Sequence, residues 1–93
     1  MSRPRSTESV FRAIADPSRR RMLDLLDTGE RTVGDLIGVL NMRKSTATFH
    51  LAALMGAGLV RQQRRGRHLM CSLDRRGLQS AQAWLARYTA AHA

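Results

Sequence analysis

The chain has 93 residues, the length of one small domain, and its 16 Lys and Arg residues outnumber its 7 Asp and Glu for a formal net charge of +9. A domain this basic favours nucleic acid as its partner over an anionic membrane surface, because no apolar run approaches the ~20 residues that span a bilayer. The single cysteine, Cys71, excludes an internal disulfide, and no N-terminal stretch resembles a secretion signal, so a cytoplasmic location is expected.

Three helices are predicted before residue 41. Residues 7–15 place apolar side chains at helical spacing. Asp16 and Pro17 are the residue types preferred at the N-cap and at the first position of a helix, so a second helix is predicted to begin there. Thr32 and Asp35 have the spacing of a capping box, which indicates the start of a third helix.

A fourth helix is predicted over residues 43–57, after a tight turn. Its inner apolar stripe is predicted to be Ala47, Leu51, Leu54 and Met55, and small hydroxyl and cationic side chains are expected on its exposed side. Two short helices joined by a tight turn, the second bearing polar groups sized for base edges, are typical of a helix-turn-helix that reads the major groove of DNA, here residues 32–57. The residues expected to contact DNA from the fourth helix are Arg43, Lys44, Ser45, Thr46, Thr48, Phe49 and His50.

The residue pattern changes after the fourth helix. Residues 59–64 and 67–73 are predicted as two short strands, with Arg65-Gly66 as the two-residue turn between them. Asp74 is a suitable cap for a last helix with an apolar stripe. The order of four helices, a β-hairpin and a helix predicts a mainly α fold of the winged helix-turn-helix type. The single domain at 1–93 is expected to comprise a basic arm at 1–6, the helix-turn-helix at 32–57, the wing at 59–73 and a C-terminal helix at 74–91.

Arginine is concentrated in the predicted wing. Guanidinium groups on a hairpin tip suit DNA phosphates or a minor groove, and the alternative is a solvated charged hairpin. The run Arg19–Arg21 in the second helix has the same two interpretations: its side chains are either only solvated or in contact with backbone phosphate. Phe49 is either laid against thymine methyl groups or packed sideways on the second helix or the wing. The wing residues expected to contact DNA are Arg61, Arg64, Arg65, Arg67 and His68.

Several segments resemble the ArsR/SmtB-type transcriptional repressors in order and spacing. Residues 15–26 are similar to the opening signature of that family, and residues 45–51 with the following Gly58-Leu59-Val60 resemble its recognition helix and the exit into the wing. Residues 64–67 resemble its wing tip, so the resemblance extends over roughly residues 10–73. It implies a homodimer that binds a palindromic operator near its own promoter and represses transcription.

The chain departs from this family at both of its common metal sites. Where the arsenic and cadmium sensors have a Cys-x-Cys pair, this chain has Thr32 and Gly34, which supply no thiolate. Where the zinc-type members have acidic residues and histidines on the last helix, the family spacing meets Arg76, Arg87 and Ala90, and His92 is isolated near the terminus. We therefore expect a member of the family without a metal cofactor or the usual metal-sensing ligands.

The resemblance also implies dimerisation through the first and last helices. Trp84 and Tyr88, one helical turn apart, either belong to this dimer interface or line a pocket for a small ligand. Cys71 is either a small buried core thiol, as its apolar neighbours suggest, or a redox switch. The residues expected at the dimer interface are Val10, Phe11, Ile14, Leu78, Ala81, Trp84, Leu85 and Tyr88.

Taken together, the residues predict a sequence-specific, DNA-binding transcriptional regulator, a homodimeric repressor on an inverted-repeat operator. The partners expected are double-stranded operator DNA, a second copy of the chain, and an unknown small-molecule or redox effector. The alternatives are a non-specific basic nucleic-acid-binding or architectural protein and a protein–protein winged-helix module. An enzyme is not expected, because the sequence has no paired carboxylates, Ser-His-Asp set or Gly-rich phosphate loop.

Overall fold

The first two helices begin at the residues that local chemistry favours. The computed structural model describes residues 7–89, with α1 over Thr7–Ile14 and α2 over Pro17–Asp27. Asp16 is the N-cap of α2, and its side chain accepts a hydrogen bond of 3.1 Å from the backbone N–H of Arg19. Pro17 occupies the first helical position, where its missing N–H costs no hydrogen bond. The predicted start of the second helix is confirmed.

The next two helices form the helix-turn-helix. Helix α3 spans Val33–Leu40 and α4 spans Lys44–Gly56. A capping box opens α3, because the N–H of Asp35 donates to Thr32 Oγ1 at 2.9 Å and the N–H of Thr32 donates to Asp35 Oδ2 at 3.3 Å. Asn41 ends α3 in the left-handed region with φ of 53°, which reverses the chain toward α4. The predicted capping box and tight turn are therefore present.

A three-stranded antiparallel sheet, ordered β1-β3-β2, replaces the predicted two-stranded hairpin. Strand β1 is the two-residue segment Arg31–Thr32, β2 is Val60–Arg65 and β3 is His68–Leu73. Arg65 pairs with His68, so the connecting residues are Gly66 and Arg67, and the prediction of Arg65-Gly66 as the turn is wrong by one residue. The reason is that Gly66 has φ of 59°, and a hairpin of this kind requires positive φ at the first turn position.

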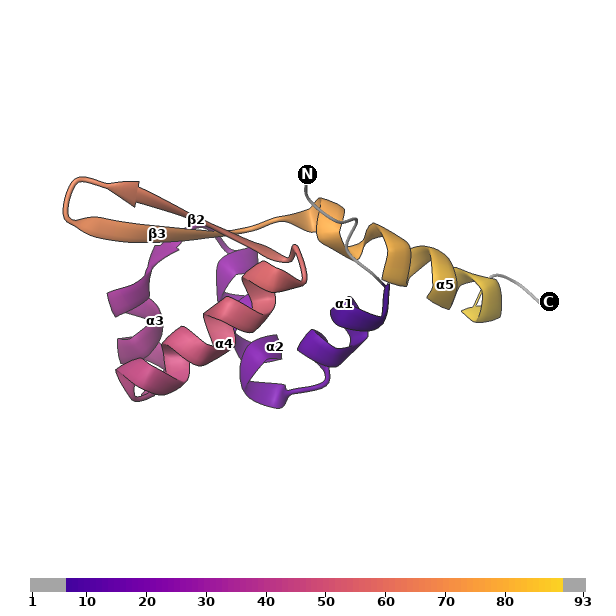
Figure 1. Cartoon of the computed structure of the whole chain (residues 1–93), viewed down its shortest axis with the longest axis horizontal. Helices are drawn as coiled ribbons and strands as arrows, with labels where there is room; N and C mark the ends of the chain where they lie inside the picture. Colours follow the sequence, from indigo (N-terminus) through magenta and orange to yellow (C-terminus); the bar gives the residue numbers. More distant parts are fainter. Residues whose placement is uncertain (1–6, 90–93) are drawn as a thin grey trace.

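The chain ends in a helix that begins as a short 3₁₀ turn. The 3₁₀ segment η1 spans Arg75–Leu78, and α5 spans Gln79–Thr89. Asp74 caps η1 by accepting a hydrogen bond from the Arg76 N–H, so the predicted cap is confirmed but the helix after it is not uniformly α. The hairpin and α5 extend toward opposite ends of the molecule, and α1 lies between α5 and the remaining helices (Figure 1).

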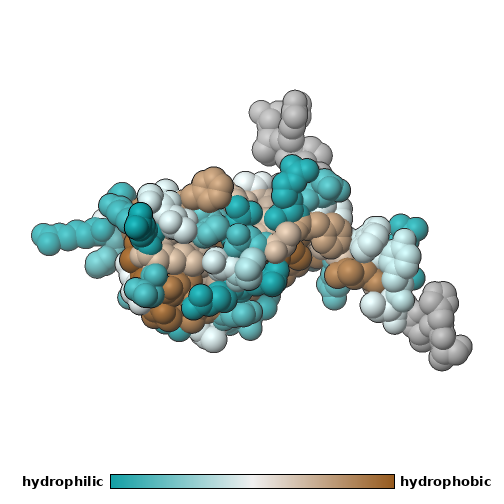
Figure 2. Space-filling model, turned by 90° about the horizontal axis from the view of Figure 1, so that it is seen from below, coloured by the Kyte–Doolittle hydropathy of each residue, from teal (hydrophilic) through white to brown (hydrophobic). Residues whose placement is uncertain are grey.

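The core gathers apolar side chains from every helix and from the sheet. Within the described residues, no helix is both long and apolar enough to cross a membrane. Seen from below, hydrophilic side chains project at the hairpin end, while apolar atoms are exposed on the part of the surface leading to α5 (Figure 2). The largest fully buried side chains are Val10, Met22, Leu36, Leu51, Leu54, Leu59 and Cys71.

Candidate nucleic-acid interface

The first turn of α4 carries the polar residues expected to read DNA. Lys44, Ser45 and Thr46 are exposed, whereas Ala47 is buried and fixes this turn to the core. Arg43 occupies the N-cap position without a side-chain hydrogen bond, so the first N–H groups of α4 keep their capacity to bind an anion. The Thr48 hydroxyl is also exposed, and it donates to the Lys44 carbonyl oxygen at 2.8 Å, which leaves its oxygen able to accept.

His50 does not lie on the exposed side of α4. Its side chain is buried at 8% exposure, and its Nδ1 accepts a hydrogen bond of 3.0 Å from Arg19 Nε in α2. The expectation that His50 presents its ring to DNA is therefore corrected: the ring joins α4 to α2. Helical spacing could have shown this, because His50 is three residues after Ala47 and four before Leu54, and both of these are buried.

The Phe49 side chain is exposed, and Arg19 of α2 contacts one face of its ring. The residue is 65% exposed, and the guanidinium carbon of Arg19 lies 5.6 Å from the ring centroid. The His50 ring packs edge-on against Phe49 at 5.7 Å between centroids. Arg19 thus orients both residues through a hydrogen bond and a cation–π contact. Nothing in the sequence distinguished Arg19 from its two arginine neighbours, because the contact joins residues 31 positions apart.

The wing separates its arginines onto two faces. Arg61 pairs with Asp74 at 3.8 Å, and Arg65 forms an ion pair with Glu30. Arg64 instead lies opposite Leu69 in the hairpin, and Leu69 is on the same face of β3 as the buried Cys71. Arg64 therefore projects from the face of the hairpin that turns toward α3 and α4. Exposed ion pairs are worth little, so phosphate could replace either carboxylate at small cost.

A surface depression joins the wing to the start of the recognition helix. Lys44, Arg64, Arg67 and His68 line it together with the first turn of α3, where Asp35 is the acidic residue present. All four basic side chains are exposed. The cationic groups of α4 and of the wing therefore share one continuous surface, which is the geometry that attracts a polyanion.

An apolar face on α1 and α5 lies apart from this cationic surface. The Phe11 ring contacts the Trp84 ring edge-on with 5.3 Å between ring centroids, and the centroids of the Trp84 and Tyr88 rings are 4.9 Å apart. Trp84, Leu85 and Tyr88 are 43%, 45% and 64% exposed, so these large apolar side chains are only partly covered within one chain.

Two of the residues expected at the dimer interface belong to the core of the protomer instead. Val10 is 1% exposed and Ala81 is 3% exposed, so these two side chains pack α1 against α5 within the chain. The expectation is corrected at these positions. Ile14 and Leu78 are partly buried and line a surface depression that also includes Leu85.

The cysteine and the family's metal positions have structural roles. Cys71 is fully buried, burial raises the pKa of its thiol, and Gln62 Nε2 donates to its sulfur at 3.6 Å, all of which favours the core thiol over the redox switch. Thr32 caps α3, and Gly34 lies in the first turn of that helix. Across residues 7–89, no three His, Cys, Asp or Glu side chains are grouped to hold a metal ion. Ala90, His92, the arm at 1–6 and the end of the predicted 74–91 helix lie outside the described residues.

Comparison with known sequences agrees with this geometry. Residues 16–62 match the family described as "Bacterial regulatory protein, arsR family". The transcriptional repressor SdpR of Bacillus subtilis is 38% identical over 77 residues, which cover 83% of this chain and 86% of that protein. A probable mercury resistance operon repressor of Streptomyces lividans is 33% identical over 70 residues, which cover 75% of this chain and 56% of that protein.

Solved structures show the same architecture. An ArsR-like transcriptional regulator from Rhodococcus sp. superposes with a TM-score of 0.79 at 27% identity, covering 90% of this chain and 79% of that one. The homodimeric winged helix-turn-helix DNA-binding domain of a possible ArsR-family regulator from Mycobacterium bovis superposes with a TM-score of 0.73 at 29% identity, covering 91% of this chain and 79% of that one. The sequence matches and the shared winged helix-turn-helix fold together show that this chain is a member of the ArsR family of bacterial transcriptional regulators.

Proposed function

We propose that the chain is a repressor that recognises an inverted-repeat operator as a homodimer. The observation that carries this proposal is the continuous cationic surface formed by the start of α4 and one face of the wing. In such an arrangement the α4 side chains read base edges and the wing arginines contact phosphate. The formal charge of +9 supplies long-range attraction to DNA.

The dimer would form through the apolar face of α1 and α5. A symmetric pair of chains that buries Phe11, Trp84, Leu85 and Tyr88 presents two copies of α4 to the same side of the DNA. Recognition helices in such dimers lie about one helical turn, roughly 34 Å, apart, which is why the operator would be an inverted repeat. The homodimeric relative from Mycobacterium bovis supports this assignment.

The protein would act by binding rather than by catalysis, in the cytoplasm where its DNA target lies. We expect it to work without a bound metal, since Thr32 and Gly34 occupy the positions of the thiolate pair and Thr32 caps α3. Release from the operator would then follow from a small-molecule effector, from thiol oxidation or from dilution. The burial of Cys71 argues against oxidation.

Competition binding tests the proposed recognition. A labelled fragment of the DNA upstream of the gene for this chain should stay bound when a large excess of random competitor DNA is added, because specific sites typically bind ~10³-fold or more tightly than random sequence. Lys44→Ala should weaken binding, whereas Arg75→Ala, which removes an arginine already paired with Asp27, should leave the preference unchanged. Equal affinity for upstream and random DNA would instead identify a non-specific basic DNA-binding protein.

Sedimentation of two α5 variants tests the proposed dimer. Leu85→Glu places a charge on the exposed apolar face and should convert the dimer into monomers. Ala83→Glu is the matched control, because residue 83 is exposed on the same helix and lies about 160° around the axis from residue 85. A dimer that survives Leu85→Glu as well as it survives Ala83→Glu would place the interface elsewhere.

A further inference from the structure

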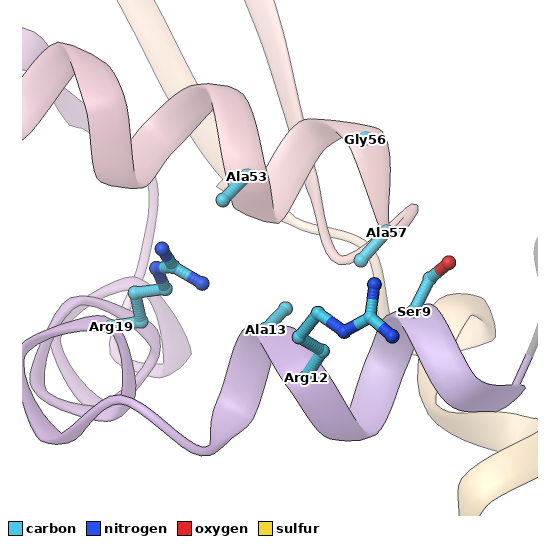
Figure 3. A pocket seen from close by; sticks show the side chains of 7 residues that line it. All are labelled: Ser9, Arg12, Ala13, Arg19, Ala53, Gly56 and Ala57. Carbon is cyan, nitrogen blue, oxygen red and sulfur yellow. The ribbon is translucent and has the colours of Figure 1, made fainter.

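Two arginines flank a small depression beside the C-terminal half of α4. Arg12 projects from α1 and Arg19 from α2, and the depression between them has a volume of about 200 Å³. Ala53 and Gly56 of α4 and the C-cap residue Ala57 also line it, and both guanidinium groups point toward α4 (Figure 3). No carboxylate lines the depression, and within residues 7–89 neither arginine forms an ion pair. The depression is therefore lined by two cationic side chains and by no carboxylate.

The depression continues the exposed side of the recognition helix. Ala53 and Gly56 follow Phe49 by four and seven residues, so they lie only about 40° and 20° around the helix axis from it. Phe49 is large and exposed, whereas the residues beyond it on this side are small. A nucleic-acid backbone could therefore approach α4 closely past Phe49, beside the depression that the two arginines line.

The two arginines have free capacity to bind an oxyanion. Arg19 uses its Nε–H for the hydrogen bond to His50, which leaves its terminal N–H groups available and fixes the direction of the side chain. Arg12 is exposed and makes no hydrogen bond to the rest of the described chain, so all of its donors are free. Guanidinium groups match the geometry of phosphate oxygens and bind them by charge-assisted hydrogen bonds.

We propose that Arg12 and Arg19 bind a backbone phosphate of the operator DNA beside the C-terminal half of α4. This inference rests on the proposed DNA-binding function and extends it, because it carries the contact surface from the N-terminal turn of α4 along the whole helix to α1 and α2. Arg19 also positions Phe49, so it couples this phosphate contact to the part of α4 that faces the bases.

The salt dependence of operator binding tests the contact. Each phosphate contact contributes about 0.9 to the slope of log K against log salt concentration, so loss of the whole contact would lower the slope by about 1.8 for a dimer. Arg12→Gln should lower the slope by part of this amount, because Arg19 remains. A slope change of about 1.8 corresponds to about 30-fold weaker binding at 0.15 M salt when affinities are equal at 1 M, and this is the upper limit for Arg12→Gln. Arg75→Gln is the matched control and should keep the wild-type slope. Thermal unfolding should confirm that Arg12→Gln folds like the wild type, since that side chain makes no internal bond.

A scan of methylphosphonate substitutions locates the phosphate. Neutralising one phosphate in each half-site should weaken the wild type strongly and Arg12→Gln less, because only Arg19 still contacts that phosphate in the variant, whereas substitutions elsewhere should weaken both proteins equally. Arg19→Lys keeps the charge but loses the His50 hydrogen bond, so it should retain part of the salt slope while weakening operator preference.

The proposal is overturned if Arg12→Gln keeps the wild-type affinity and slope, or if no phosphate shows the coupled effect. Failure of the proposed function appears differently, because the wild type itself would then show no preference for its upstream DNA.

Discussion

The close approach of Gly77 to Gly58 gives a sharp prediction about how η1 and α5 are attached to the rest of the domain. A Cβ atom on residue 77 would lie 2.0 Å from the carbonyl oxygen of Gly58 and 2.7 Å from its carbonyl carbon. Both of these are backbone atoms, so no side-chain rotation relieves the clash. The neighbouring hydrogen bond from the Asp74 N–H to the Leu59 carbonyl oxygen, 2.8 Å long, ties the same two segments together. Gly77→Ala therefore forces η1 away from the loop between α4 and β2.

The magnitude follows from the size of the required displacement. Ordinary contact of a Cβ needs more than 3 Å, so the two backbone segments must separate by about 1 Å or more. Overpacking of this kind costs up to about 3 kcal/mol, and the absence of a mobile side chain places Gly77→Ala at the upper end. For a domain of this size that loss lowers Tm by roughly 12–24 °C.

Calorimetry at one fixed protein concentration measures the effect, because dimerisation makes Tm depend on concentration. Gly38→Ala is the control: no atom lies within 4 Å of the added methyl group, and alanine in a helix interior should raise stability by about 0.5–1 kcal/mol. A Gly77→Ala protein that melts within about 2 °C of the wild type, a shift worth well under 1 kcal/mol, would refute the reasoning.

Three further predictions concern the helix caps and the recognition helix. Thr32→Ala breaks the capping box of α3 and should lower the free energy of unfolding in urea by about 1 kcal/mol, whereas Thr32→Ser should retain it. The hydrogen bond from Arg76 holds the pKa of Asp74 below its usual value, so the stability that this carboxylate contributes is present above about pH 4 and is lost as the pH falls through its lowered pKa. Urea titrations should show the stability difference between wild type and Asp74→Asn vanishing on that acid limb, and a constant difference down to pH 2 would contradict the assignment. Phe49→Ala should weaken operator binding on the order of 10-fold while changing random-DNA binding little, since the ring is exposed for base contact, and equal losses on both DNAs would argue against that contact.

Local sequence predicted the helices well because their starts depend on neighbouring residues. Asp16, Pro17 and the Thr32–Asp35 capping box act within one turn of the chain, and each is found where the sequence placed it. The exposed turn of α4 was also predictable, since helical periodicity separates its polar side from Ala47 and Leu51. The resemblance to ArsR-type repressors could be recognised because it, too, is carried by short segments of neighbouring residues.

Other features depend on residues that are distant in sequence. The strand β1 has only two residues, too few for a periodic pattern, and it exists because Arg31 and Thr32 pair with Cys71 and Met70. The wing arginines divide between two faces because side chains alternate along β2, and the pairing of Arg64 with Leu69 places Arg64 on the face that turns toward α3 and α4.

The sequence by itself determined the order of helices, the basic character and the family, because caps, periodicity and charge are properties of neighbouring residues. Only the tertiary structure decided which candidate residues reach the surface. Packing of α2 against α4 buried His50 and placed Arg19 over Phe49, and packing of α1 against α5 buried Val10 and Ala81. The placement of Arg12 and Arg19 around one depression beside α4 has the same origin, since it depends on how α1 and α2 pack against α4.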